Sequence, residues 1–364
     1  MSGMSEAFAG TYAQARRKFL DAAADAGLQV ESWLHPLKGS EGENLAMDVA
    51  RDGPADASAL LILSSACHGV EGFCGSGVQV AALRDSNWRE HARAKGVAVL
   101  SIHGLNPYGF SHLRRTTHEN VDLNRNFNDY SRPLPVNDAY RDVQALLLPQ
   151  EWPPSAADAS EIENYLATRG ASAFQAALTR GQHEFPDGLF FGGTEASWSN
   201  RTLREVLRAH GSRATRIAWI DIHTGLGPSG VGERIYAARD DQATLQRARQ
   251  WWGGGTTPVT TIYDGSSASA FLTGMMFNAV YDECPQAEYT GIALEYGTVP
   301  LMQTLQALRG EQWLDRHPET APERVLQIRH QVKDAFYTDT GEWKEQVVAQ
   351  AREALFEAAQ GLAS

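Results

Sequence analysis

Two short apolar runs, 59–63 and 97–102, of which the second is broken only by Ser101, lie on either side of a helical stretch at 78–84. A strand that is apolar at consecutive positions is typical of a sheet covered on both faces. Strand, helix and strand in this order indicate parallel strands between helical layers. The sequence therefore predicts an α/β fold with a twisted, mostly parallel mixed β-sheet that is flanked by helices.

Other segments extend this sheet and its helices. An amphipathic helix that ends at Gly27 is expected near the start of the chain. The segment 133–213 is mostly helical and polar in pattern, and the tail from about 322 predicts two helices broken near 338–341. Further strands are expected at 28–34, 44–50, 216–223, 234–238, 257–263 and 291–297. No linker-like stretch divides the chain, so we expect one domain over 1–364, with a helical insertion at about 133–213 and C-terminal helices from about 322.

Composition excludes several classes of partner. Acidic residues outnumber basic ones by 44 to 32, which leaves a net charge of −12, and no segment gathers Lys and Arg into a stripe. We therefore expect neither nucleic acid nor an anionic membrane surface as a partner. No run approaches the ~20 apolar residues that a membrane span needs. Nothing in the composition indicates an oligomeric state.

The start of the chain and the cysteines bear on location. Arg16, Arg17 and Lys18 stand where a signal peptide would need an unbroken apolar stretch. The 3 cysteines are too few and too odd in number for a disulfide framework. Together these features favour a cytoplasmic protein.

Polar residues follow the predicted strands at the ends where ligands bind in open α/β sheets. His68 and Glu71 come after the run 59–63, and Asn106 follows the run 97–102. His223 ends another strand, and Glu295 lies near the end of the last one. Because distant strand ends meet at one edge of a parallel sheet, these side chains are candidates for a common site.

Three of these residues match the ligand count of a catalytic zinc site, which uses three protein ligands and leaves one position open. His68, Glu71 and His223 supply that count, and Gly69, Gly72 and Gly75 would let the loop bend around an ion. A surface His–Glu pair and a solvent-facing His at a strand end are the plainer alternatives. Cys67 and Cys74 flank the motif, but small buried thiols are common core residues, so we leave them out.

The segment 114–129 is almost free of hydrophobic residues and rich in groups that bind anions. Asn124 and Arg125 offer an amide beside a guanidinium fork, which suits two-point binding of a carboxylate. Arg114 and Arg115 precede them by about ten positions. A solvated, charged loop is the alternative interpretation.

These blocks, taken together, resemble the zinc carboxypeptidase superfamily, the M14 type of metallopeptidase, and especially its bacterial DUF2817 branch. They occur in family order over about residues 60–300. The matching blocks are His68-x-x-Glu71, "NPYGF" (106–110), "VDLNRNF" (121–127), "DIHTGLG" (221–227), "TTIYDGSS" (260–267) and "ALEYGT" (293–298).

The resemblance implies a carboxypeptidase-like fold and a metal centre. His68, Glu71 and His223 would hold one zinc ion per chain, and Asp122 would orient the first histidine. Glu295 would be the general base and proton shuttle. Its apolar neighbours at 292–294 favour burial, which raises the pKa of a carboxyl group into a useful range.

The resemblance also implies how a substrate binds. Asn124 and Arg125 would grip its carboxylate, and Arg115, with Arg114 as the reserve, would face the carbonyl of the bond to be cleaved. Tyr263 stands where carboxypeptidases have a mobile tyrosine that closes over substrate. The spacing from Tyr263 to Glu295 is longer here than in digestive carboxypeptidases.

We therefore expect a zinc hydrolase that cleaves an amide bond next to a free carboxylate in a small peptide. The short spacing before Asn124 also resembles the succinylglutamate desuccinylase and aspartoacylase branch, so an N-acyl amino acid deacylase is the close alternative. A binding module without turnover is the third interpretation. Loss of a metal ligand or of the base would favour it, but His68, Glu71, His223 and Glu295 are all present. A serine hydrolase is not favoured, because no Gly-x-Ser-x-Gly motif surrounds the chain's candidate serines.

Two features bear on specificity. Residues 267–271, where carboxypeptidases line the side-chain pocket, contain no acidic residue that would select Lys or Arg. Phe190, Phe191 and Trp198 could narrow one side of the cleft, with ordinary core packing as the alternative.

Overall fold

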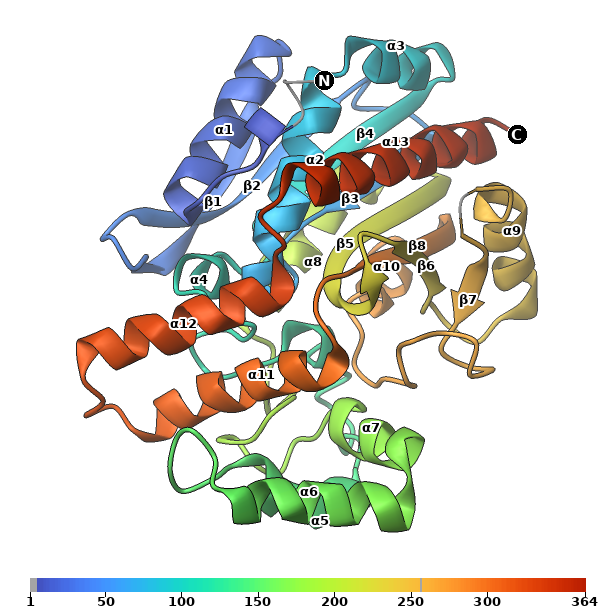
Figure 1. Ribbon diagram of the computed structural model, residues 1–364. Helices are drawn as coiled ribbons and strands as arrows, with labels where there is room; N and C mark the ends of the chain where they lie inside the picture. Colours follow the sequence, from blue (N-terminus) through green and yellow to red (C-terminus); the bar gives the residue numbers. More distant parts are fainter. Residues whose placement is uncertain (1–4, 256) are drawn as a thin grey trace.

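Strands from most of the chain's length form one sheet at the centre of the protein (Figure 1). The computed structural model describes residues 5–255 and 257–364. Within them the strand order is β1-β2-β4-β3-β5-β8-β6-β7. The strands are β1 (Val30–Lys38), β2 (Asn44–Asp52), β3 (Ala59–Ser64), β4 (Val97–His103), β5 (Arg216–Ser229), β6 (Gly232–Tyr236), β7 (Val259–Thr261) and β8 (Glu288–Gly297).

The middle of the sheet is parallel and its margins are mixed. β4, β3, β5 and β8 run parallel to one another, whereas β2 is antiparallel to β4 and β6 is antiparallel to β8. All six residues of β3 are buried, as expected for a strand covered on both faces. The predicted α/β fold with a mostly parallel mixed sheet is therefore confirmed.

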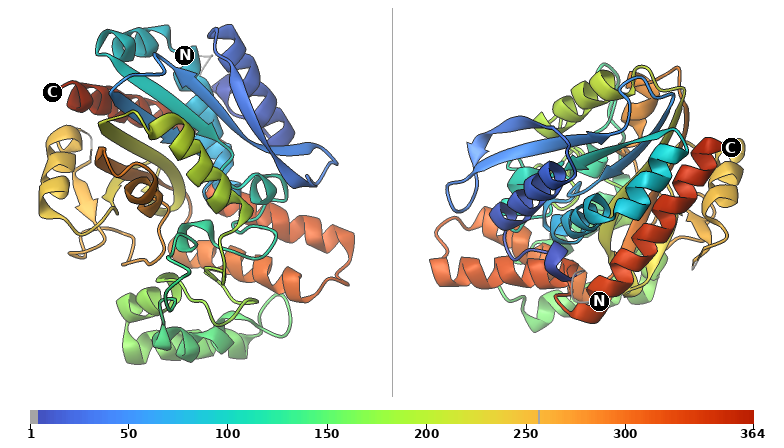
Figure 2. Two further views of the ribbon diagram at one scale, coloured as in Figure 1. Left: turned by 180° about the vertical axis from the view of Figure 1, so that it is seen from behind. Right: turned by 90° about the horizontal axis from the view of Figure 1, so that it is seen from above.

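Helices cover both faces of this sheet, as the two views in Figure 2 show. On one face lie α1 (Tyr12–Asp25), α2 (Gly72–Arg84), α3 (Ser86–Ala94) and α13 (Gly341–Ala363). The other face carries α8 (Trp198–Gly211) and α10 (Asn278–Glu283), and α9 (Gln242–Trp252) packs near β6, β7 and β8. The first helix ends next to Gly27, whose φ of 74° closes it as predicted.

A second group of helices lies beyond the carboxyl ends of the central strands (Figure 1). It contains α5 (Asp138–Leu147), α6 (Ala156–Arg169), α7 (Ala171–Thr179) and the hairpin of α11 (Leu301–Arg316) and α12 (Pro322–Phe336). The segment predicted as a helical insertion thus holds α5 to α8, of which α8 packs on the sheet. The break near 338–341 separates α12 from α13. Among the described residues no helix is long and apolar enough to span a membrane.

The glycine-rich stretch after β3 differs from its sequence-based interpretation as a loop. The short 3-10 turn Gly69–Glu71 leads directly into α2, so Gly72 and Gly75 are helical. A Cβ at Gly75 would lie 2.6 Å from Cβ of Ser65, and one at Gly69 would lie 2.1 Å from the carbonyl carbon of Gly109. These glycines therefore bring two backbone segments into close contact, which a larger residue would prevent.

We predict that Gly69→Ala destabilises the protein, because its new methyl group would meet main-chain atoms of α4 (Pro107–Ser111) that cannot rotate away. The free energy of unfolding, measured by urea denaturation, should fall by about 1–3 kcal/mol. Gly254→Ala is the matched control, since nothing lies within 4 Å of the Cβ position there. Equal stability of the two variants would contradict this packing argument.

Candidate active site

Strand register brings residues from distant parts of the chain to one edge of the sheet. β5 and β8 pair in parallel with His223 opposite Glu295. β3 pairs with β5 so that Ser64 stands opposite Asp221, and the chain then turns directly into His68 and Glu71. The candidate residues therefore converge because three neighbouring parallel strands end together.

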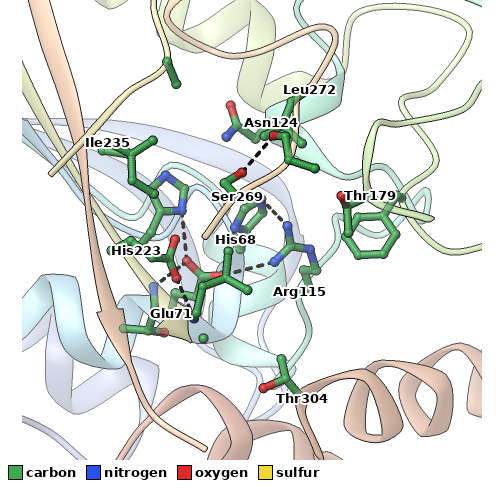
Figure 3. A pocket seen from close by; sticks show the side chains of 18 of the residues that line it. His68, Glu71, Arg115, Asn124, Thr179, His223, Ile235, Ser269, Leu272 and Thr304 are labelled. Carbon is green, nitrogen blue, oxygen red and sulfur yellow. Dashed lines mark hydrogen bonds and ion pairs between the residues drawn. The ribbon is translucent and has the colours of Figure 1, made fainter. Parts of the chain in front are cut away.

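His68, Glu71 and His223 form a buried group that could hold a metal ion. Their ligand atoms all lie within 4.8 Å of one another. Nδ1 of His68 lies 2.8 Å from Oε1 of Glu71, and Nδ1 of His223 lies 3.0 Å from Oε2. Figure 3 shows the three side chains pointing toward one another. Two imidazoles and one carboxylate are a donor set that suits a catalytic zinc ion.

Each imidazole has a carboxylate behind it. Nε2 of His68 lies 3.2 Å from Oδ1 of Asp122, and Nε2 of His223 lies 2.5 Å from Oδ2 of Asp221. Metal-binding histidines usually place such a carboxylate on the far nitrogen, which fixes the ring and makes it a better ligand. Asp122 was predicted for this place. Asp221 was not, although its position two residues before His223 puts both on one face of the strand.

The charges of this group depend on one another. Burial works to raise the pKa of Glu71, but His68 and His223 hold it well below its usual range. Burial likewise opposes the charged form of His223, yet Asp221 raises its pKa well above the ordinary value. A divalent cation bound there would compensate the negative charge of Glu71, and imidazoles that bind a metal do so in the neutral form.

A second group of possible ligands, Cys67, Asp221 and His223, lies beside the first. Burial raises the pKa of the Cys67 thiol well above its usual value, which keeps sulfur protonated. Asp221 is already engaged with His223 and accepts a hydrogen bond from the Ser64 hydroxyl. The group of His68, Glu71 and His223 therefore fits a metal better.

Arg115 lies against this group. Its Nη1 donates to Oε1 of Glu71 at 3.1 Å, and its Nε donates to Oδ2 of Asp122 at 3.0 Å. Nη2 lies 2.8 Å from Nε2 of His68. From behind, the carboxylate of Glu311 in α11 accepts the backbone N–H of Arg115 with both oxygens, at 3.1 and 3.0 Å. Glu71 and Asp122 therefore hold the guanidinium of Arg115, while Glu311 holds its backbone.

The structure places Arg114 elsewhere. Its guanidinium donates to Glu311, Asp315 and the Thr116 hydroxyl, and it is not among the residues that line the pocket. Only one of the two neighbouring arginines faces the site, because Glu311 and Asp315 of α11 bind the guanidinium of Arg114 and Glu71 and Asp122 bind that of Arg115.

Asn124 and Arg125 line the same pocket as the metal group. Oδ1 of Asn124 accepts the backbone N–H of Met276 at 2.9 Å. Nε and Nη2 of Arg125 donate to the carbonyl of Thr179 at the end of α7, at 2.9 and 2.7 Å. The end of α7 therefore holds Arg125, which was predicted to bind a substrate carboxylate.

Glu295 is also in the pocket, with 8% of its surface exposed. Its Oε1 accepts the backbone N–H of Leu226 at 3.0 Å. Burial, and then the negative charge of Glu71, raise the pKa of Glu295 to about 8. A carboxyl group that titrates near neutral pH can both take up and release a proton in a reaction cycle.

The rest of the pocket is mostly apolar. It has a volume of about 120 Å³, and its wall includes Ser269 and Ala270 from the 267–271 segment. Apolar lining also comes from Leu178, Phe190, Ile235, Ile262, Leu272, Met275, Phe277, Leu305, Leu308 and Phe336. Of the three aromatic residues proposed to narrow the cleft, only Phe190 lines it.

Tyr263 is not among the lining residues, although its neighbour Ile262 is. The Tyr263 hydroxyl donates to the carbonyl of Ala238 at 2.6 Å, and its ring lies 5.9 Å from that of Phe271. The structure therefore does not bring Tyr263 together with the metal group.

Comparisons with known proteins agree with this fold. Residues 8–350 match the family described as "Protein of unknown function (DUF2817)". No curated protein sequence matches the chain.

Among solved structures, thrombin activatable fibrinolysis inhibitor superposes with a TM-score of 0.53 at 10% identity, covering 97% of this chain and 77% of that one. The bovine protein, in complex with tick carboxypeptidase inhibitor, gives 0.52 at 12% identity and 98% of each chain. A metallo-carboxypeptidase from Burkholderia cenocepacia gives 0.43 at 12% identity, covering 96% and 68%. At such identities the likeness concerns the fold, which is carboxypeptidase-like.

The contact between Asp221 and His223 leads to a prediction for metal binding. Asp221→Asn should lower the affinity for Zn²⁺ about 10–100-fold, because the neutral amide no longer strengthens the imidazole as a ligand. Competition with a zinc-binding dye would measure this. Asp129→Asn, which removes an exposed carboxylate paired with Arg132, is the control and should bind zinc normally. Unchanged affinity in Asp221→Asn would exclude this group as the metal site.

Proposed function

The chain belongs to the DUF2817 family, and on that premise we propose that it is a zinc-dependent hydrolase that cleaves an amide bond next to a free carboxylate. One observation carries the proposal. The buried group of His68, Glu71 and His223 shares a single pocket with an acid–base candidate, Glu295, and with two guanidinium groups. This combination offers a metal site, a proton acceptor and two anion-binding groups within reach of one small substrate.

His68, Glu71 and His223 would hold one zinc ion per chain. The two carboxylates behind the imidazoles keep the rings in the orientation that presents Nδ1 to the ion. A zinc ion bound there would act as a Lewis acid toward the scissile carbonyl and would increase the acidity of a water molecule.

Glu295 would move the proton. Its carboxylate, anchored through Oε1 to the Leu226 amide, would accept a proton from the attacking water. The same side chain would then deliver that proton to the leaving nitrogen, which must be protonated before the carbon–nitrogen bond can break. Its raised pKa supports both steps, because a carboxyl group that titrates near neutral pH binds a proton strongly enough to accept it and weakly enough to release it.

Arg115 and the Asn124–Arg125 pair would bind the two oxygen-bearing groups of the substrate. Arg115 would donate hydrogen bonds to the carbonyl oxygen as negative charge develops on it. Removal of one such donor typically costs ~10²–10³ in rate. Asn124 and Arg125 would bind the free carboxylate, and the apolar wall of the pocket would accept an uncharged side chain.

An N-acyl amino acid deacylase is the alternative that the same residues support. The mostly apolar wall of the pocket and its two guanidinium groups suit a small acylated amino acid as well as a short peptide. A peptidase and a deacylase would use the same zinc ligands and the same base. They would differ in whether the group on the far side of the amide is a peptide or a short acyl chain.

We predict that Glu295→Gln keeps the fold and about one zinc per chain but loses turnover by ~10²–10⁴-fold, because the amide cannot accept a proton. Elemental analysis and a steady-state assay would measure the two quantities. Glu288→Gln, which changes an exposed carboxylate on the same strand paired with Arg247, is the matched control. Full activity of Glu295→Gln with zinc bound would remove Glu295 from the mechanism.

A panel of substrates tests the type of reaction. Dipeptides and tripeptides with C-terminal Phe, Leu, Lys and Glu would be compared with the N-acetyl, N-succinyl and N-benzoyl forms of the same amino acids. We expect cleavage that favours apolar residues next to the free carboxylate and that disappears when this carboxylate is amidated. Cleavage of N-acyl amino acids alone would favour the deacylase. No cleavage by the zinc-loaded protein would contradict the hydrolase itself.

A further inference from the structure

Phe190 combines a rare backbone conformation with a place in the wall of the pocket. Its φ is 55°, in the left-handed region that bulky side chains rarely adopt, and it is 7% exposed. Holding a bulky residue in this region is costly, and such strain persists only where the surrounding structure fixes the backbone.

Backbone contacts on both sides fix this conformation. The Phe190 carbonyl accepts the N–H of Gln182 at 3.2 Å, and the Phe191 carbonyl accepts the N–H of Asp122 at 2.7 Å. The second contact ties the segment directly to the residue that orients His68. The position of the Phe190 ring is therefore coupled through the main chain to the loop that carries Arg125.

The ring touches both guanidinium groups of the site. The Cζ atoms of Arg115 and Arg125 lie over the Phe190 ring, 5.2 and 5.5 Å from its centroid. The two buried cations repel each other: burial, together with the charge of Arg115, lowers the pKa of Arg125. Asp122 contacts the same two guanidinium groups as the ring. Its carboxylate binds Nε of Arg115 at 3.0 Å and lies 3.7 Å from Nη1 of Arg125.

We infer that Phe190 sets the separation of Arg115 and Arg125 and thereby selects substrates by the number of atoms between the scissile carbonyl and the free carboxylate. This inference rests on the proposed function. Arg115 is the donor proposed for the carbonyl and Arg125 the donor proposed for the carboxylate. Their spacing therefore acts as a ruler, with Phe190 as a positioning residue that touches both ends.

Two ligands that differ by one methylene test the ruler. N-benzoyl-phenylalanine has one carbon between the amide nitrogen and the carboxylate. N-benzoyl-β-homophenylalanine keeps the benzyl side chain and has two. The zinc-loaded wild-type protein should prefer the first in kcat/KM. In Phe190→Leu this preference should fall about tenfold, because neither guanidinium is then held against an aromatic ring.

Two variants distinguish a role of Phe190 in substrate selection from a role in packing alone. Phe190→Tyr keeps an aromatic face and should preserve the preference. Phe191→Leu removes the neighbouring ring, which is buried but does not line the pocket, and should also preserve it. If Phe190→Leu does not fold, Phe190→Met replaces it in every arm. A role in packing alone would lower activity on both ligands equally and leave their ratio unchanged.

A binding measurement repeats the comparison without turnover. Calorimetry in the Glu295→Gln background would give the dissociation constants of both ligands, with and without Phe190→Leu, and their ratio should again change about tenfold. If the wild-type protein hydrolyses the ligands but Phe190→Leu leaves the ratio of dissociation constants unchanged, the ruler is overturned and the proposed function stands. Absence of both hydrolysis and binding would overturn the two together.

Discussion

A carboxylate as deeply buried as Glu71, which is 1% exposed, can stay ionised only if donors surround it. It receives Nδ1 of His68 and of His223, Nη1 of Arg115 and the backbone N–H of Thr224 at 3.1 Å. These donors come from the turn after β3, from β5 and from the segment before η3 (Leu123–Arg125). The placement of one charge therefore ties together three parts of the chain, and a metal ion would bind at the point where they meet.

The elements outside the sheet keep this arrangement in place. Glu311 in α11 binds the backbone of Arg115, while Thr179 at the end of α7 binds the guanidinium of Arg125. The same helices supply Leu305, Leu308 and Leu178 to the pocket wall. One set of helices thus closes the cleft and orients its cations, so the shape of the pocket and its electrostatics are not independent.

Much of the sheet was predictable because β3 and β4 are mostly apolar and buried at every position, which leaves little choice of environment. Other elements were not predicted. The glycines at the start of α2 have low helix propensity, but close packing on Ser65 and Phe110 requires them there. α11 buries Arg309 and Glu311 where a helix normally shows apolar residues. Its amphipathic pattern is hidden, because these charges are matched by partners that lie more than a hundred residues away.

The chemical groups of the site can be read from the sequence: two imidazoles and a carboxylate at strand ends, a second carboxylate on the last strand, and an Asn–Arg pair. The tertiary structure decided how they are used. It turned Arg115 toward the metal group and Arg114 toward α11, placed Asp221 behind an imidazole, and set the Phe190 ring against two guanidinium groups. Spacing along a chain restricts which residues can meet, whereas the direction of a side chain depends on partners that only folding brings near.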